Sequence, residues 1–180
     1  MYSLTAKRTN LALWTKVLGV LLFATATAAS ARMSVLLPFS PVPLTLQVLV
    51  VVLSGLVLGA KGGLAAQMLY LQAILLGAPL TASGLGGPAA FLAPTAGYLW
   101  AFPVAAALAG WLSQQTTRRT LWRVAGGLGA MAVIYALGMA WLAHFVGGVA
   151  NAFKLGVLPF VGADLLKVVI ATGALSLRRK

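Results

Sequence analysis

Six apolar stretches, each about as long as a membrane-spanning helix, are the strongest constraint on how this chain folds. They cover residues 11–31, 44–60, 64–80, 89–112, 122–149 and 155–177, and a spanning helix needs about 17 to 25 predominantly apolar residues. Proline, glycine or polar runs separate the stretches, as expected for turns. Only 8% of the residues are charged, far below a soluble domain. We therefore predict an all-α membrane protein in which residues 1–180 form a single domain of six transmembrane helices.

The basic residues orient this bundle. If the N-terminus lies in the cytoplasm, the inner side carries Lys7, Arg8, Lys16, Lys61, Arg118, Arg119, Arg123, Arg178, Arg179 and Lys180, whereas the outer side carries only Arg32 and Lys154. Positive residues gather on the cytoplasmic side of membrane proteins. The sequence thus predicts cytoplasmic N- and C-termini and a multi-pass protein in the cell (plasma) membrane of a bacterium or archaeon.

The net charge of +12 has the same origin. Basic residues flank apolar stretches and are not interleaved with aromatic residues on a polar surface, so we exclude nucleic-acid binding. The chain has no cysteine, which excludes disulfides, thiolate chemistry and cysteine-ligated metal sites.

The first stretch has two interpretations. Basic residues at 7–8, the apolar run 17–24 and small residues at 26–31 also resemble a cleavable signal peptide. We favour an uncleaved helix because the stretch from Leu11 is long enough to span a bilayer. The spacing of Ala24 and Ala28 also gives this helix a smooth face for close packing.

Asp164 is the single acidic side chain of the sequence, and it lies inside the sixth apolar stretch, three residues before Lys167. Residues three apart share a face of a helix, so the two side chains can form an ion pair. A charge at membrane depth costs about 2.5 to 3.5 kcal/mol on insertion scales and is by default a functional-site hypothesis. The alternative is a pair that only makes the two charges tolerable.

The predicted orientation brings polar groups from three separate stretches to the outer half of the bundle, beside this pair. The candidate binding residues are Asp164, Lys167, Thr45, Gln47, Gly87, Pro94, Thr95 and Tyr98. A mostly apolar pocket with a few convergent polar groups is typical of a small-molecule site. Prolines and glycines in outer loops are, however, more often turn residues than ligand contacts, and we interpret the lone His144 as an interface residue.

Several motifs resemble a known family. They are Pro-Val-Pro-Leu-Thr-Leu-Gln at 41–47, Gly-Gly-Pro at 86–88, Pro-Thr-Ala-Gly-Tyr at 94–98, Ile-Tyr-Ala-Leu-Gly at 134–138, and Gly-Val-Leu-Pro-Phe at 156–160 leading into Asp164 and Lys167. In this order, over nearly the whole chain, they resemble the BioY family, the biotin-specific substrate-binding (S) components of energy-coupling factor (ECF) vitamin transporters. Ala93 and Ala96 stand where that family usually has glycine.

The resemblance implies a high-affinity biotin binder with an outward-facing pocket capped by the first loop. It also implies that Asp164 and Lys167 belong to the ligand site. A lysine can pair with the biotin carboxylate, and a carboxylate can accept N–H bonds from the ureido group. Which charged residue meets which end of biotin stays open at this point.

The sequence contains no G-x-x-x-x-G-K-[ST] phosphate-binding loop. The resemblance implies that an ECF transmembrane coupling protein and a pair of ABC ATPases supply the energy, although some family members are proposed to work without dedicated ATPases. Ala24 and Ala28 match the small-residue face by which S components dock to the coupling protein. We expect no metal, no cofactor and no catalytic residues in this chain.

Two rival functions remain. An intramembrane enzyme would need a catalytic set assembled from Asp164, Lys167, His144 and a hydroxyl, and no spacing such as H-E-x-x-H supports one. An S component for another vitamin, or a generic small-solute carrier, would need a different pocket, since thiamine is a cation and riboflavin a large flat ring.

Overall fold

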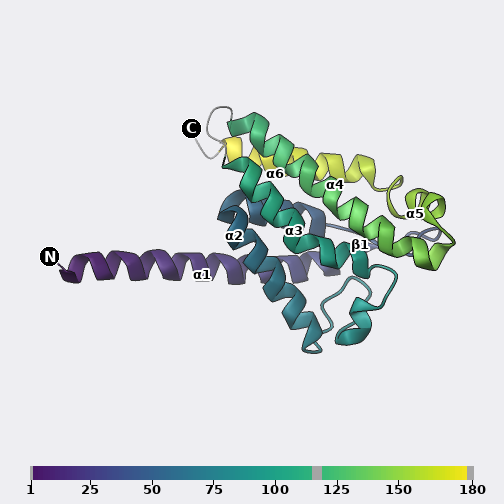
Figure 1. Cartoon of the computed structure of the whole chain (residues 1–180), viewed down its shortest axis with the longest axis horizontal. Coiled ribbons are helices and arrows are strands. Elements are labelled where there is room, and N and C mark those ends of the chain that lie inside the picture. Colours follow the sequence, from purple (N-terminus) through teal and green to yellow (C-terminus); the bar gives the residue numbers. More distant parts are fainter. Residues whose placement is uncertain (1, 115–118, 178–180) are drawn as a thin grey trace.

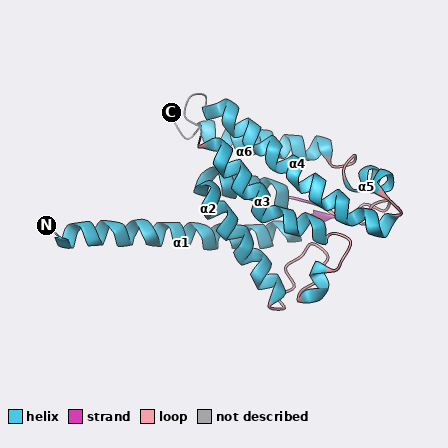
Figure 2. Ribbon diagram, viewed as in Figure 1, coloured by secondary structure: helices cyan, strands magenta, loops and turns pink. Residues whose placement is uncertain are grey.

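The chain folds into six α-helices, one 3₁₀ helix and one pair of short strands within the part that the structure describes. This computed structural model describes residues 2–114 and 119–177. The elements are α1 (Tyr2–Arg32), β1 (Ser34–Val35), β2 (Leu44–Thr45), α2 (Gln47–Leu75), η1 (Pro88–Phe91), α3 (Ala96–Ser113), α4 (Arg119–Val146), α5 (Val149–Gly156) and α6 (Val161–Leu177). Figure 2 shows how little of the molecule lies outside helices. The prediction of an all-helical protein is confirmed.

Helix α2 is a helical hairpin rather than one straight rod. Gly59 has φ 75° and ψ 177°, outside the helical region, and glycine alone adopts this conformation without a steric cost. The Gln47 amide nitrogen lies 2.9 Å from the Tyr70 hydroxyl. In a straight helix these residues would be separated by roughly 35 Å, at 1.5 Å per residue. The two arms, 47–58 and 60–75, therefore run antiparallel, and they correspond to the second and third predicted helices.

Glycines, which have no side chain, let α2 and α3 approach until their backbones are in contact. A Cβ atom on Gly55 would lie 2.1 Å from the Ala106 carbonyl oxygen, and one on Gly110 would lie 2.3 Å from the Ala60 backbone nitrogen. Small residues at helix interfaces are the usual means of close packing in membrane proteins. The contact places α3 in the middle of the bundle, where its side chains form much of the buried core.

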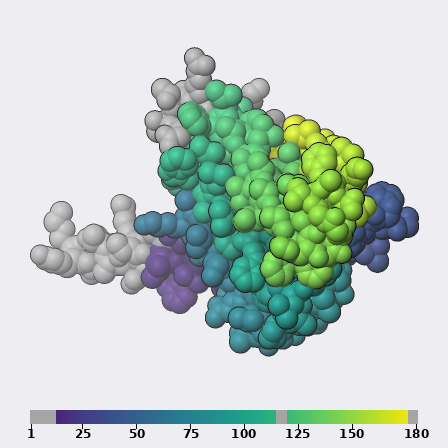
Figure 3. Space-filling view, turned by 45° about the vertical axis from the view of Figure 1, so that its right-hand side comes forward, coloured from purple at the N-terminus to yellow at the C-terminus, as the bar shows by residue number. Residues whose placement is uncertain are grey.

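The two ends of the bundle differ in structure. The start of α1 and the end of α6 lie at the same end, at the left in Figure 1. At the opposite end lie α5, the β1–β2 pair and the first turns of α3 and α6. Ser34 pairs with Thr45 and Val35 with Leu44, so residues 33–46 form a strap across this end, and part of it protrudes at the right edge of Figure 3.

The loop between α2 and α3 corrects two predicted helix boundaries. The third predicted helix, 64–80, ends at Leu75, because Gly77 has φ 103° and Pro79 follows. The fourth predicted helix, 89–112, begins only at Ala96, since Pro94 disfavours a helical residue before it. The loop is fixed to the end of α1, where the Arg32 guanidinium donates a hydrogen bond to the Pro79 carbonyl.

The sixth predicted helix, 155–177, is wrong as one continuous helix. It is broken between Gly156 and Val161, and α5 and α6 meet at an angle of 57°. Pro159 lies in the break; it has no N–H to donate and its ring clashes with the preceding turn of a helix. The break places Asp164 in the first turn of a new helix.

Four helices are long and apolar enough to cross a membrane, or five if α5 and α6 together count as one bent span. The chain is thus a multi-pass membrane protein. Arg118, Arg178, Arg179 and Lys180, which contribute to the predicted orientation, lie outside the described residues.

Candidate binding site

A buried ion pair forms the polar centre of the site. The Lys167 ammonium nitrogen lies 2.6 Å from Oδ1 of Asp164, and both residues lie on α6 with exposures of 7% and 3%. The predicted i, i+3 pairing is therefore present in the folded chain. Two charges removed from water are stabilised only when their remaining hydrogen-bonding capacity is also used, so their other partners decide what the pair does.

Asp164 has a second partner on α4. The Tyr135 hydroxyl donates to Oδ2 of Asp164 at 2.6 Å, so each carboxylate oxygen accepts one short hydrogen bond. Asp164 also lies in the first turn of α6, where the positive end of the helix dipole favours an anion. The Asp164 carboxyl group thus contacts a cation and a phenol at a helix N-terminus.

Lys167 has a second partner on the strap. Its ammonium group donates to the Thr45 carbonyl oxygen at 2.6 Å, which joins α6 to β2. A hydrogen bond from the Ser40 hydroxyl to the Leu155 carbonyl, at 2.6 Å, ties the strap to α5. The strap is therefore held over the ion pair at two points.

Thr45 and Gln47 lie where the strap enters α2. The Thr45 hydroxyl accepts a hydrogen bond from the Gln47 backbone N–H at 3.2 Å, and the Gln47 side chain is bound to Tyr70. Both residues line the same cavity as Asp164 and Lys167. The structure thus brings these four predicted residues together.

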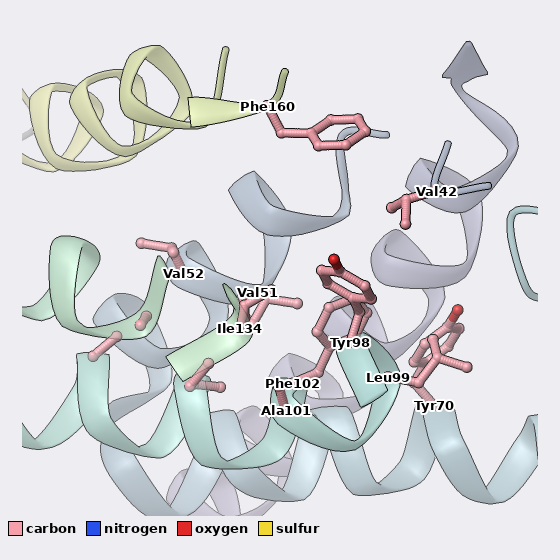
Figure 4. Close-up of a cluster of buried hydrophobic side chains, with 14 of the residues drawn as sticks. Val42, Val51, Val52, Tyr70, Tyr98, Leu99, Ala101, Phe102, Ile134 and Phe160 are labelled. Atoms are coloured by element: carbon pink, nitrogen blue, oxygen red, sulfur yellow. The ribbon is translucent and has the colours of Figure 1, made fainter. Parts of the chain in front are cut away.

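Tyr98, from the first turn of α3, forms another wall. Its hydroxyl donates to the Gly156 carbonyl oxygen at 2.8 Å, and its ring lies against Gly138, where a Cβ atom would come within 2.3 Å of it. Figure 4 shows Tyr98 facing Val42 and Phe160 across the space beneath the strap. Thr95, the N-cap residue of α3, also lines the cavity, and its side chain makes no capping bond.

The cavity enclosed by these residues has a volume of about 70 Å³. Pockets that hold small organic ligands usually measure about 300–1,000 Å³. Its lining is mostly apolar, with valine, leucine, isoleucine, phenylalanine and tyrosine side chains around the ion pair. The strap and the region of the α5–α6 break both contribute to this lining, with Val42, Pro43, Leu44 and Thr45 from the strap and Gly156 and Phe160 from the break.

Two predicted residues do not line the cavity. Gly87 has φ 69° and precedes Pro88 at the start of η1, and its N–H donates to the Ile74 carbonyl oxygen at 2.7 Å. Pro94 precedes α3 and is likewise absent from the lining. Both residues lie in the loop between α2 and α3, and their predicted contact with a ligand stays a prediction.

The small-residue face of α1 is turned largely inward. Ala24 is buried with 6% exposure and belongs to the hydrophobic core, while Ala28 is half-buried and packs against that core. Nearby, the Gln67 amide of α2 donates to the Thr27 hydroxyl of α1 at 3.2 Å. Within the isolated chain this face packs on α2, which leaves Ala28 as the more accessible of the two.

Sequence reasoning did not select Tyr135, Phe160 or Thr81 as site residues, although each lines the cavity. Tyr135 and Phe160 lie in motifs that carried the family resemblance, which was the available signal. His144 lies beside the Trp141 ring, with centroids 6.4 Å apart, and does not line the cavity. Among the described residues no group of three metal-ligating side chains occurs.

A family model described as the BioY family matches residues 5–180. The chain belongs to the BioY family. A protein named as a probable biotin transporter BioY from Pyrococcus horikoshii is 44% identical over 152 residues, which cover 84% of this chain and 88% of that protein. The biotin transporter BioY of Thermotoga maritima is 38% identical over 135 residues, covering 75% of this chain and 79% of that protein.

A solved structure also shares the BioY fold found here. The crystal structure of the S component for biotin from an ECF-type ABC transporter superposes with a TM-score of 0.86. The alignment covers 95% of this chain and 94% of that one, at 22% sequence identity. At this identity the likeness establishes the fold, and the assignment to the BioY family rests on the sequence matches.

Proposed function

We propose that this BioY-family protein captures biotin at the outer face of the cytoplasmic membrane, as the substrate-binding component of an ECF-type transporter. The observation that carries the proposal is the buried Asp164–Lys167 pair at the polar centre of an otherwise apolar cavity. Biotin needs this combination, because it joins an apolar bicyclic ring and an aliphatic tail to two polar ends. The names of the relatives from P. horikoshii and T. maritima support the same ligand.

Binding uses the strap as a cover. The cavity is small while Lys167 holds the Thr45 carbonyl oxygen, so biotin enters when the strap lifts and is enclosed when it returns. Ring and tail lie against Val42, Tyr98 and Phe160, which face one another in Figure 4. Burying apolar ligand surface stabilises the complex by about 25 cal/mol per Å², and the ion pair supplies charge-assisted hydrogen bonds to the polar groups.

Transport requires partners that supply energy. We propose that an ECF transmembrane coupling protein and a pair of ABC ATPases move the loaded component. The proposal is supported by the structurally similar biotin S component, which comes from an ECF-type ABC transporter. Docking through α1 is part of the proposal, with Ala28 as the contact residue because Ala24 is buried.

Biotin uptake by cells tests the proposal. A biotin-requiring bacterium without its own biotin transporter should take up labelled biotin when it expresses this chain with a coupling protein and ATPases. Excess unlabelled biotin should compete, whereas thiamine and riboflavin should not. Uptake no higher than in cells with an empty vector, despite the protein being present in the membrane, would contradict the proposal.

The orientation of the site gives a second prediction. The sequence has no cysteine, so a single introduced cysteine reports its own side of the membrane. We expect Leu36→Cys, on the exposed strap, to react with a membrane-impermeant maleimide in intact cells. Lys61→Cys, exposed near the α2 turn, should react only after the cells are opened. The reverse pattern would place the pocket on the cytoplasmic side.

A further inference from the structure

Tyr70, a tyrosine outside the cavity, is hydrogen-bonded to Gln47, which lines the cavity. The Gln47 side-chain nitrogen donates to the Tyr70 hydroxyl at 2.9 Å, and that hydroxyl donates to the Leu80 carbonyl oxygen at 3.1 Å. Gln47 and Tyr70 have exposures of 5% and 1%, so neither can exchange these partners freely with water. The chain Gln47–Tyr70–Leu80 connects the start of α2 to its second arm and to the following loop.

The direction of the two bonds determines the orientation of the amide. A phenol has one proton, and Tyr70 gives it to the Leu80 carbonyl, which has no proton to return. The Tyr70 oxygen can therefore only accept from Gln47, and it must face the amide NH₂ group. If the amide were reversed, the phenolic proton would go to Gln47 and the partly buried bond to Leu80 would be lost, which is unfavourable.

The Gln47 oxygen is consequently the atom left for the cavity. Gln47 lines the cavity and Tyr70 does not, so the nitrogen is directed away from the ligand space. The contact recorded for Oε1 is with the Thr45 hydroxyl, at 3.4 Å, which is long for an O–H···O bond. An amide oxygen has two lone pairs, so Gln47 retains the capacity to accept a strong hydrogen bond.

We propose that Tyr70 is a specificity-determining positioning residue, which holds Gln47 so that its amide oxygen reads an N–H group of the ligand. The inference rests on the proposed function, because in biotin the N–H donors are those of the ureido group. A site built to bond a ligand N–H discriminates strongly against an analogue that lacks it, since the site's own polar group is then left unpaired. Tyr70 contributes to this selection without touching the ligand.

A double-mutant cycle tests the proposal with two kinds of ligand. Biotin and its two analogues carrying a methyl group on one ureido nitrogen are titrated into the purified wild type, Tyr70→Phe, Gln47→Leu and the double variant. The preference for biotin is the dissociation constant of an analogue divided by that of biotin. For one of the two analogues, this ratio should be at least about 10-fold larger in the wild type than in Gln47→Leu. Tyr70→Phe, which removes one oxygen and keeps the ring stacked on Phe102, should lose most of that preference. The double variant should lose no more than Gln47→Leu alone, because coupled residues are not additive.

Tyr135→Phe is the matched control, since it removes a hydroxyl that binds Asp164 and has no recorded bond to Gln47. The fold-change in preference of the variant Tyr135→Phe/Gln47→Leu should therefore lie within about threefold of the product of the two separate fold-changes. Equal preferences in Tyr70→Phe and the wild type, or additive effects of Tyr70→Phe and Gln47→Leu, would overturn the inference. If Tyr70→Phe does not fold, an unchanged preference in Gln47→Leu alone would overturn it. A folded wild type that does not bind biotin would instead overturn the proposed function, and the inference with it.

Discussion

We expect that replacing either member of the buried ion pair abolishes tight biotin binding while the protein still inserts into the membrane. We expect Asp164→Asn and Lys167→Met each to weaken binding by about 100-fold or more, since hydrogen bonds to charged groups contribute about 1.5–3 kcal/mol each. Each side chain holds two partners: Asp164 binds Lys167 and Tyr135, and Lys167 binds Asp164 and the Thr45 carbonyl. Titration calorimetry on the purified variants measures the loss.

The double variant separates binding from stability. A single replacement strands the other charge in the protein interior, which costs about 3–5 kcal/mol, whereas Asp164→Asn/Lys167→Met leaves no charge behind. We therefore expect the double variant to unfold at a higher temperature than either single variant and still not to bind biotin. Single variants that bind biotin like the wild type would show that the pair is not part of the ligand site.

The second large effect is expected at a glycine that supports Tyr98. A Cβ atom on Gly138 would lie 2.3 Å from two carbon atoms of the Tyr98 ring. The ring cannot simply move aside, because its hydroxyl is bonded to the Gly156 carbonyl oxygen and packs directly against Gly156, where a Cβ atom would lie 2.2 Å from it. We expect Gly138→Ala to destabilise the protein by about 1–3 kcal/mol through overpacking and to weaken biotin binding about 10-fold or more by displacing a cavity wall.

Gly173→Ala is the matched control for this prediction. Gly173 lies on α6, and nothing lies within 4 Å of the position its Cβ would take. The control should bind biotin normally and be as stable as the wild type or more stable by up to about 1 kcal/mol, the helix propensity gained. The double variant Tyr98→Leu/Gly138→Ala should lose less stability than the sum of the losses in the two single variants. Fully additive losses would mean that the glycine acts independently of Tyr98.

Local patterns predicted the parts of the site that depend on one helix. Asp164 and Lys167 pair because residues three apart share a helix face, whatever surrounds the helix. Tyr135 could not be found in this way, because it comes from α4 and lies 29 positions before Asp164. Its approach depends on how α4 packs against α6, and no periodicity within either helix specifies that contact.

The errors in the fold have local causes that the sequence does contain. Hydropathy continues through Pro159, so an apolar window joins α5 and α6, although a proline in a helix interior breaks or kinks it. Gly87 and Pro94, predicted to bind the ligand, lie outside the cavity lining at the entries to η1 and α3, and their contact with a ligand stays a prediction. Conversely, the predicted break between the stretches 44–60 and 64–80 is present, and the positive φ of Gly59 is what reverses α2.

Titration of biotin into the purified protein in detergent tests the central claim most directly. We predict one-to-one binding with a dissociation constant below about 1 μM, equivalent to about 8 kcal/mol or more of binding free energy, and no heat from thiamine or riboflavin under the same conditions. A sample shown by its cooperative thermal unfolding to be folded, yet giving no heat with biotin, would contradict the assignment of this cavity to biotin.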